Sequence, residues 1–590
     1  MRGTRIAHRQ WLTRDSIWKI VVILAIGYFL IWPMVMLAFG AVRTTPFGRE
    51  GTWTLSGFAT VLTDPRTPGV VLSSAIYATA ATFGCMALGL YFVMVSTRMD
   101  TSLRRIVGPA MIVLLATPRL FYALSWAMLG NPHSGLMAYT ARLVGIPNLP
   151  EWATVYSWPG LIGVTALKLT AFCYLLLYGP ATRIDRSLED AAVMAGVPRV
   201  RAFFHVTVTS LAPALLATGM FVFVENLRLF DMPAVIGAPA RIYMLPVRVN
   251  DYLLENVRAN WPAASALSSL IVIVVATLIY LQTVILRNRD FTTISGKATP
   301  PTPVSIGARG YLVDASIVAF IIVAIVLPLV QIVLGSFQPF FGLYGAYTLS
   351  NYQFVFGEDV SWILVVTFLI AVTGGFIAVA SAFGLALLMQ RRPGTFLAGL
   401  ARLGSWVPVL APGIVLSLAL LWAYLNTPLV KTLYGTPWLM LLALIVGSIP
   451  VATRTVEGIV AQVGREVEEA ARACGANTLS AVMRITAPLS APSLLAAWLI
   501  VGLGISGTLD IPLLFQSISA HTVATMAFYL YNYGQVTQAA ALFIAYLVSV
   551  MIVVGVVVLA GWVTRRVFLH RVRKRQGVLQ TTGGLRAATR

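Results

Sequence analysis

The stretch EEAARACGANTLSAVMRITAPLSAP, residues 468–492, lies between two long apolar segments of this chain. A similar stretch, EDAAVMAGVPRVRAFFHVTVTSLAPA, runs from residue 189 to residue 214. We call them motif copy 1 (189–214) and motif copy 2 (468–492). Each pattern predicts a helix, a glycine that ends it in the left-handed conformation, and a second helix with apolar residues at helical spacing. A polar element that occurs twice in a very hydrophobic chain indicates one function in both places.

The sequence around the two motif copies is too apolar for a soluble protein. Of its 590 residues, 58% are hydrophobic and 11% are charged, whereas soluble domains carry about 25% charged residues. Runs such as 20–39 and 264–286 reach the roughly 20 residues that cross a bilayer as a helix. We predict an all-α integral membrane protein with about twelve transmembrane helices, near 20–42, 71–96, 106–129, 158–179, 211–230, 262–286, 311–336, 360–389, 403–425, 438–453, 489–509 and 539–564.

The charge of the chain indicates its orientation. The net charge of +21 could suggest nucleic acid. With the amino terminus inside and twelve crossings, however, the inner segments hold 31 of the 42 Lys and Arg residues and the outer loops hold 8. This bias is the positive-inside rule, so we predict that both termini are cytoplasmic and that nucleic acid is not a partner. The basic tail at 565–576 is expected to bind anionic membrane lipid.

Constant offsets divide the chain into two repeats. Several Glu, Gly, Asp and Pro residues recur at one fixed distance along the chain. Residues closer to the start of each half recur at a slightly greater fixed distance, because the first half has a longer outer loop than the second. We predict a first repeat at 1–290, a cytoplasmic linker at 291–310 and a second repeat at 311–590. Six spans in each make the repeats parallel and bring both motif copies to the cytoplasm. The pairs at the shorter offset are Glu189/Glu468, Gly196/Gly475, Pro213/Pro492, Asp231/Asp510 and Pro233/Pro512, and Pro118/Pro412 keeps the longer one.

The second helix of each motif copy carries an apolar ridge that a short helix cannot bury. The ridge includes Phe203 and Phe204 in motif copy 1 and Val482 and Met483 in motif copy 2. Docking in a groove of a paired partner would cover both ridges. The alternative is an interfacial helix that lies on lipid headgroups.

The pattern Glu-x-Ala-Ala-x-x-x-Gly resembles the EAA loop of binding-protein-dependent ABC importer permeases. The resemblance covers nearly the whole chain in two fused copies, and the stretch 229–243 is most similar to ferric-iron-type permeases. Thr209 departs from this repeat, since motif copy 2 has Pro488 there, which could alter the entry of motif copy 1 into its span. The residues that the resemblance assigns to ATPase coupling are Glu189, Ala191, Ala192, Gly196, Phe203, Phe204, Glu468, Ala470, Ala471, Gly475, Val482 and Met483.

The resemblance implies a type I ABC importer permease fold in a bacterial inner (plasma) membrane. Its partners would be two copies of a cytoplasmic ABC ATPase and an external solute-binding protein. ATP and magnesium would be used by the partner subunits, and no cofactor would be bound by this chain, which has no G-x-x-x-x-G-K-[ST] phosphate loop. The implied cargo is ferric iron or an iron chelate, with thiamine, polyamine and phosphonate as alternatives.

Ionisable residues within predicted spans are candidates for the transport pathway, because they are costly there. They are Arg119, Lys168, Glu225, Arg228, Asp231 and Asp510. Each also has a structural interpretation: Glu225 and Arg228 can pair three residues apart on one helix, Arg119 and Lys168 can extend to the membrane surface, and the two Asp residues can cap helices. Three cations suit an anionic cargo better than a bare ferric ion, and no metal-ligand cluster is predicted.

Two other classes of function compete with the importer permease. An ion-coupled secondary transporter can also have two parallel six-span halves, but it leaves the doubled motif unexplained. A membrane enzyme would need a group of catalytic residues near one face, and the five histidines are scattered along the sequence.

Overall fold

The computed structural model describes residues 14–46, 49–146, 154–184, 187–255, 259–287, 304–305, 307–516 and 521–557, with positions 150, 152, 559 and 561. Within these residues, ten helices are long and apolar enough to cross a membrane, and two bent pairs of helices meet the same test together. These twelve segments match the twelve predicted spans. The ten helices are Trp18–Ala41, Thr67–Arg98, Trp158–Thr182, His205–Arg228, Trp261–Ile285, Arg309–Phe337, Glu358–Arg391, Pro437–Ala461, Thr478–Gly507 and Val536–Val557.

The third and ninth predicted spans are wrong in one respect, since neither is a single helix. Each turns directly before or at a proline, Pro118 or Pro412, which becomes the N-cap of the next helix. Proline has no N–H and disfavours the helical conformation of the residue before it, so the helix ends there. The pairs are Arg104–Ala116 with Arg119–Leu129, bent by 97°, and Phe396–Leu410 with Gly413–Leu425, bent by 117°.

The first half contains thirteen α-helices among the described residues. Their bounds are α1 Arg14–Ile26, α2 Trp32–Ala41, α3 Ser56–Thr63, α4 Thr67–Arg98, α5 Arg104–Ala116, α6 Arg119–Leu129, α7 Leu136–Leu143, α8 Trp158–Thr182, α9 Ser187–Met194, α10 Arg199–Ala202, α11 Thr209–Arg228, α12 Leu245–Asn250 and α13 Trp261–Arg287. A two-residue strand, β1 (Met99–Asp100), pairs in parallel with β2 (Val304–Ser305). Most of the predicted linker 291–310 lies outside the described residues.

The second half repeats this order. Its helices are α14 Arg309–Ile321, α15 Leu327–Phe337, α16 Ser350–Val355, α17 Glu358–Arg391, α18 Phe396–Trp406, α19 Gly413–Leu425, α20 Pro428–Lys431, α21 Pro437–Ala461, α22 Arg465–Ala473, α23 Thr478–Ala481, α24 Ala487–Gly507, α25 Pro512–Phe515 and α26 Val523–Asn532, followed by the span Val536–Val557.

A long central helix organises each half. α4 packs along α8 and α11, and α17 packs along α21 and α24. Small residues allow α4 and α8 to approach closely, as is usual between membrane helices. The backbone of Gly89 faces the Cβ of Cys173, and the Sγ atoms of Cys85 and Cys173 lie 3.5 Å apart. This pairing of two buried thiols was not predicted from the sequence.

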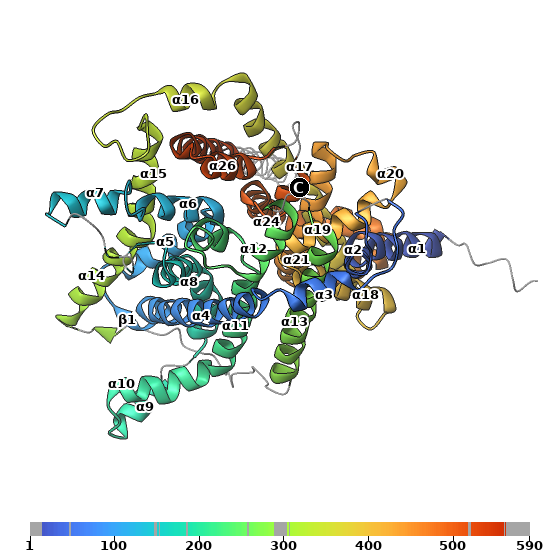
Figure 1. The fold of residues 1–590 in the computed structure, drawn as a ribbon. Helices are drawn as coiled ribbons and strands as arrows, with labels where there is room; N and C mark the ends of the chain where they lie inside the picture. The colour runs from blue at the N-terminus through green and yellow to red at the C-terminus, as the bar shows by residue number, and fades with distance from the viewer. Residues whose placement is uncertain are drawn as a thin grey trace, which may run out of the picture.

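The first span of each half packs against the other half. α2 lies along α19, and α15 lies along α6. In Figure 1 the blue helices α1 and α2 accordingly lie beside the orange α18 and α20, while the yellow-green α14 and α15 lie beside the blue-green α5 and α6. At the two contacts the backbone of Gly40 faces the side chain of Trp422, and the backbone of Gly335 faces that of Met128. Each half is therefore held by a helix that belongs to its counterpart.

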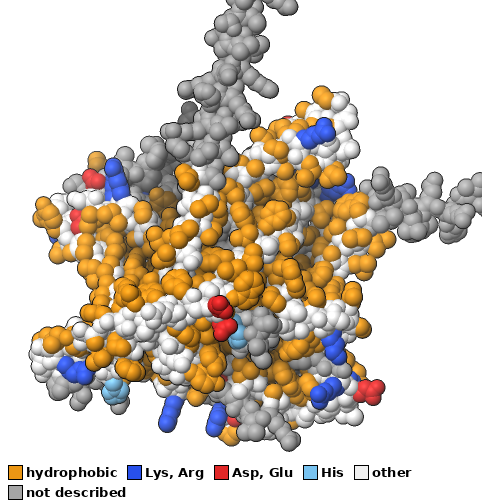
Figure 2. All heavy atoms as spheres, turned by 90° about the horizontal axis from the view of Figure 1, so that it is seen from above, with side chains coloured by type: hydrophobic (Ala, Val, Ile, Leu, Met, Phe, Trp, Pro, Cys, Tyr) orange, Lys and Arg blue, Asp and Glu red, His pale blue; other side chains and the backbone are white. Residues whose placement is uncertain are grey.

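The outer surface of the bundle is largely hydrophobic. The face in Figure 2 is covered mainly by apolar side chains, and most of the Lys and Arg side chains in view lie near its margins. Large apolar side chains such as Phe83, Ile112 and Phe376 are more than half exposed. Exposure of so much apolar surface to water would be unfavourable, so we expect this surface to face the hydrocarbon core of a bilayer.

Candidate functional site

The two motif copies have the same backbone path. The helix α9 or α22 ends at a glycine with positive φ, +86° at Gly196 and +88° at Gly475. In both, the glycine N–H and the next N–H return to carbonyls of the last helical turn, for example Gly475 N to Arg472 O at 2.9 Å. These bonds form the Schellman motif that a left-handed glycine permits. The predicted helix–glycine turn–helix is confirmed in both copies.

The sequence suggested that the second helix of each motif copy is short and separate from the membrane span. In the structure this helix instead continues into the span. α10 continues through a π-helical turn at Phe203–Val208 into α11, and α23 continues through a similar turn at Val482–Thr486 into α24. The path is the same although Thr209 occupies the place of Pro488. Pro488 lies within two residues of the end of its π-helical turn, as Thr209 does, and the chain continues as a helix through both positions.

The motif glutamate of copy 2 points into its own chain. Glu468 is 6% exposed. Its carboxylate lies 3.0 Å from the guanidinium of Arg391, the last residue of α17, and accepts a 2.7 Å hydrogen bond from Thr486. Arg391 also donates to the carbonyl oxygen of Val463, in the link between α21 and α22, at 2.9 Å. One buried carboxylate thus joins three segments of the second half.

Motif copy 1 repeats this network. Glu189 lies 3.6 Å from Arg98, the last residue of α4, and accepts a hydrogen bond from Thr207. Arg98 donates to the carbonyl oxygen of Ile184 at 3.2 Å. Ile184, Glu189 and Thr207 each precede their counterparts in the second half by the same offset. The first network is looser and less buried, with 19% of the Glu189 side chain exposed against 9% for Glu468.

Each motif copy also presents exposed apolar side chains. Leu188, directly before copy 1, and Met194 within it are 53% and 88% exposed; in copy 2, Leu479 and Met483 are 71% and 60% exposed. The alanines beside the glutamates are small and partly or fully exposed: Ala191, Ala192, Ala470 and Ala471. Val482 is partly buried, and the side chains of Phe203 and Phe204 lie outside the described residues.

Both motif copies lie at one end of the bundle. At copy 2, the guanidinium of Arg392 is 6.0 Å from the ring of Trp18, at the start of the first span. That span ends at Gly40, against Trp422. The Trp422 indole donates to Ser265, near the start of α13, at 2.8 Å, and α13 begins at the end of the bundle away from copy 1. The ends of the two halves that are distant from the motif copies therefore lie together. The two motif copies accordingly lie together at the opposite end of the bundle.

A second group of predicted residues meets between the halves. Glu225 lies between two guanidiniums, 2.9 Å from Arg119 and 3.2 Å from Arg228. Arg228 also donates two hydrogen bonds, at 2.9 and 3.2 Å, to the carbonyl oxygen of Ala411 at the break in the other half. Arg119 is the least covered of the three, with 46% of its side chain exposed. The predicted pairing of Glu225 with Arg228 is confirmed, and Arg119 joins it.

Lys168 completes the break between α5 and α6. Its ammonium donates to the carbonyl oxygens of Leu114 and Thr117, the latter at 2.5 Å. In an unbroken helix the Leu114 carbonyl would accept from residue 118, but Pro118 has no N–H. Lys168 supplies the missing donor and places a positive charge at the carboxyl end of α5, where the helix dipole favours one. The structure therefore gives Lys168 a structural role.

The two aspartates lie beside this group. The Asp510 carboxylate occupies the space where Gly413, the first residue of α19, has no side chain, and a negative charge is favourable at a helix N-terminus. Asp231 is 7% exposed. The two carboxylates interact electrostatically with each other, and both interact with Arg119. All six predicted pathway residues are thus gathered around the two breaks.

The charged residues of the first half correspond to glycines in the second. At the two offsets of the repeat, the pairs are Arg119/Gly413, Lys168/Gly447, Glu225/Gly504 and Arg228/Gly507. A Cβ on Gly504 would have no atom within 4 Å. The first half therefore brings four ionisable side chains to the centre at positions where the second half has glycine, whereas Asp231 and Asp510 recur in both halves.

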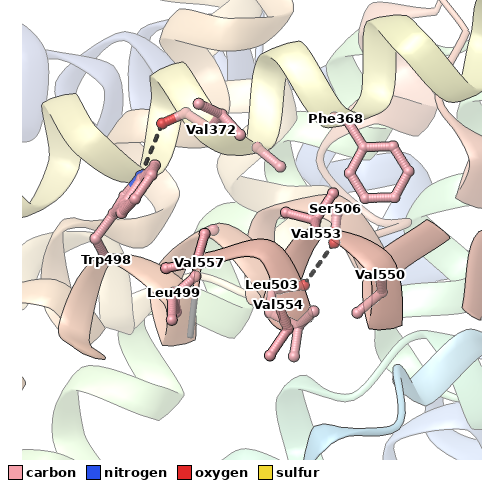
Figure 3. A pocket seen from close by; sticks show the side chains of 12 residues that line it. Phe368, Val372, Trp498, Leu499, Leu503, Ser506, Val550, Val553, Val554 and Val557 are labelled. Atoms are coloured by element: carbon pink, nitrogen blue, oxygen red, sulfur yellow. Dashed lines mark hydrogen bonds between the residues drawn. The ribbon is translucent and has the colours of Figure 1, made fainter. Parts of the chain in front are cut away.

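Two hollows lie elsewhere in the second half. One, of about 330 Å³, borders motif copy 2 and is lined by residues such as Gln462, Val467 and Ser490. The other is apolar and lies between α17, α24 and the last span (Figure 3). In that view the Trp498 indole donates to the carbonyl oxygen of Val372 at 2.9 Å, and Ser506 points to the carbonyl of Leu503. Among the described residues, no three His, Cys, Asp or Glu side chains are placed to hold a metal ion.

Comparison with known proteins decides the family. Residues 86–290 and 374–569 each match the family of binding-protein-dependent transport system inner membrane components. The chain belongs to this family. It is accordingly a multi-pass membrane permease of a transport system, with the type I ABC importer permease fold in two copies, and the resemblance of the doubled motif is confirmed.

Relatives of this chain have names that refer to different cargoes. A ferric transport system permease of Haemophilus influenzae is 22% identical over 482 residues, 81% of this chain and 74% of the relative. A 2-aminoethylphosphonate transport system permease of Salmonella typhi is 24% identical over 245 residues, 40% of this chain and 83% of the relative. A solved alginate ABC transporter, in complex with a periplasmic protein, is similar with a TM-score of 0.39 and 15% identity over 48% of this chain and 99% of its own.

Sequence reasoning missed the partners of the motif glutamates. Arg98 and Arg391 end their helices far upstream, along the sequence, of the glutamates that they bind. One signal was present: both arginines end the second span of their half, and Thr207 and Thr486 keep the offset that relates Glu189 to Glu468. Arg98 and Arg391 do not keep either offset, so their shared place at the end of the second span was the signal that could have found them.

Proposed function

We propose that this permease belongs to an ATP-driven importer, in which two copies of a cytoplasmic ABC ATPase dock on the two motif copies. The observation that carries the proposal is the pair of elements with one backbone path, at one end of the bundle, each with exposed apolar side chains on its outer side. Two elements with one backbone path suit two copies of one partner, although their exposed apolar side chains lie at different positions of the repeat. The motif end would be cytoplasmic, and both termini would lie on that side.

The docking surfaces would be formed by side chains that have no apolar neighbours of their own to cover them. Leu188 and Met194 would enter a groove on one ATPase, and Leu479 and Met483 would enter the equivalent groove on the other. Met and Leu suit this task because their side chains adapt to an apolar groove. ATP and magnesium would bind to those partners, and the chain itself would need no cofactor.

Alternating access would follow from movement between the halves at the two breaks. In the present arrangement Arg228 of the first half holds the Ala411 carbonyl of the second, and Gly507 of the second packs against Pro118 of the first. These contacts cross the centre of the molecule and have to separate when a path opens between the halves. An external solute-binding protein would deliver the cargo at the far end.

We propose ferric iron, carried as a small anionic chelate, as the cargo. The ferric transport relatives span most of the chain. The cations of the central group favour an anionic complex over a bare trivalent ion, for which oxygen-rich ligand clusters would be needed. A phosphonate is the second candidate, because it is an anion and the phosphonate permease is also similar.

Co-purification with the ATPase encoded nearest to this permease tests the docking. The wild-type chain should retain the ATPase, and Leu479→Asp together with Met194→Asp should release it, because each places a charge in an apolar groove. Leu349→Asp, at another apolar position that is more than half exposed and lies at the far end, is the control. Retention of the ATPase by the double variant would count against these surfaces.

Transport assays in proteoliposomes test the energy source and the cargo. Uptake of ferric citrate should need the ATPase, the binding protein and ATP, and should exceed uptake of thiamine, putrescine and 2-aminoethylphosphonate. Uptake by the permease alone, driven by a proton or sodium gradient, would favour the secondary transporter instead.

A further inference from the structure

The networks around Glu189 and Glu468 suggest what the motif glutamates do. Glu189 lies on α9 and Glu468 on α22, the first helix of each motif copy, which we call the docking helix; only 19% and 9% of their side chains are exposed, whereas the apolar side chains proposed for docking are more than half exposed. Each binds the last residue of the longest helix of that half, 32 residues in α4 and 34 residues in α17. The docking helix and the central helix are therefore joined by a carboxylate and a guanidinium.

We propose that the two motif glutamates are positioning residues that transmit ATPase movement to α4 and α17 and do not themselves contact the ATPase. The proposal rests on the proposed function, since it presupposes an ATPase at the docking helices. It differs from a docking role for the glutamates, which the resemblance alone would suggest.

Burial is the first argument for this role. The Glu468 side chain is 9% exposed and is bound by Arg391 and Thr486. A partner could reach the carboxylate only by breaking these contacts and leaving the Arg391 guanidinium buried without its counter-ion, which is strongly unfavourable. Glu469, the next residue, is by contrast 62% exposed and is available to any partner.

The arrangement of the three segments is the second argument. Arg391 binds Glu468 of the docking helix and also Val463 in the link before it. Thr486, at the end of the π-helical turn after the docking helix, binds the same carboxylate. A displacement of α22 is therefore opposed on both sides of the helix unless the end of α17 moves with it. Arg98, Ile184, Glu189 and Thr207 form the same network at the end of α4.

α4 and α17 are well placed to carry the movement across the membrane. α17 packs along α21 and α24, and α4 packs along α8 and α11, so each contacts helices that lead to the central charged group. Packed interiors deform little and move as units. A shift at the motif end of α4 or α17 should therefore appear at its far end, near residues 67 or 358.

Spin labels at the far ends of the two central helices test this inference without knowledge of the cargo. Gly69 and Asp359 are exposed there, and both would be changed to cysteine in a chain with Cys474→Ser. The complex with its ATPase, in lipid nanodiscs, would be measured by electron paramagnetic resonance before and after addition of ATP and vanadate. The wild-type distance distribution should shift when the ATPase dimer closes.

Glu468→Gln removes the charge and keeps the shape, and Glu469→Gln is its matched control. Loss of one charge-assisted hydrogen bond changes an equilibrium constant by roughly a factor of ten. We therefore expect the ratio of shifted to unshifted complexes to be about tenfold lower in Glu468→Gln than in wild type. ATPase binding should stay within about twofold of wild type, because the docking surface is untouched. Glu469→Gln should shift as wild type does, and Glu189→Gln should have a smaller effect, since its network is looser.

Three outcomes would overturn the inference. A full ATP-driven shift in Glu468→Gln would show that the network transmits nothing, and loss of ATPase binding in that variant would show that the glutamate is a docking contact. If Glu468→Gln fails to fold, Arg391→Gln removes the charge of the other partner and leaves the docking helix unchanged, and a full shift in that variant would also count against the inference. The proposed function fails separately, at the earlier step, if the wild-type chain retains no ATPase.

Discussion

Replacing Gly475 by alanine should loosen motif copy 2 without any steric clash. A Cβ added at this position would meet no atom within 4 Å, so the effect should come from the backbone alone. The residue has a φ of +88°, and an L-residue in the left-handed region costs about 1–2 kcal/mol. The same free energy corresponds to a factor of about 5–30 in the equilibrium between closed and open forms of the turn.

Hydrogen–deuterium exchange of peptides from 465–481 measures this change. Exchange of the two N–H groups that close the turn, those of Gly475 and Ala476, should become about 5–30 times faster in Gly475→Ala. Gly458→Ala is the matched control, because Gly458 also has open space around it but lies within α21. Alanine stabilises a helix interior by up to about 1 kcal/mol, so exchange there should slow. Equal effects of the two substitutions, or no effect at Gly475, would refute the backbone argument.

Three further changes test other parts of the structure. Lys168→Met keeps the apolar stem but leaves the carbonyl oxygens at the break without their donor. We expect the free energy of unfolding to fall by about 1–3 kcal/mol, which a lower denaturation midpoint in detergent would show. An unchanged midpoint would contradict the role of Lys168. Cys85 and Cys173 should form a disulfide under a membrane-permeant oxidant, with a mass lower by two hydrogen atoms; two thiols that still alkylate after unfolding would contradict the packing of α4 on α8. Burial would raise the pKa of Asp64, but hydrogen bonds from a backbone N–H and from Arg248 outweigh it and hold that pKa below its usual value. The stabilisation is therefore present above the usual pKa of a free aspartate and lost as pH falls through the lowered value, and Asp64→Asn should flatten this acid limb of the thermal stability profile.

The sequence was sufficient for the architecture because hydrophobicity and repetition act over long stretches. Twelve apolar segments, the constant offset between the halves and the doubled glycine all had direct structural counterparts. The domain boundaries and the role of the motif residues in ATPase coupling stay predictions, as does the cytoplasmic placement of the termini.

The breaks at Pro118 and Pro412 show why the shape of the spans could be predicted only in part. Both prolines were recognised as a repeat, but the apolar residues on either side have the composition of one continuous span. A proline can kink a membrane helix or end it, and composition does not distinguish the two. In the first half the break is stabilised by a hydrogen-bond donor that is distant in sequence, the Lys168 ammonium.

Long-range pairing explains the other omissions. Six charged candidates were named separately, and only the pair three residues apart could be joined from the sequence. That Arg119 meets Glu225 and that Arg228 reaches Ala411 depends on how the halves pack. The same holds for Arg98 and Arg391, whose helices had to end beside the motif copies for a repeated ion pair to form.

The exchange of first spans between the halves has a consequence for biosynthesis. The helix that ends at Gly40 is made first, yet Trp422, the side chain that covers it, is made only in the second half of the chain. At about 5–20 residues per second, ribosomes need roughly 20–80 s to make the intervening stretch of about 380 residues. During this time lipid or the insertion machinery has to shield the waiting surface. A ribosome that stalls in the second half would therefore leave an orphaned helix in the bilayer, which quality-control proteases could recognise.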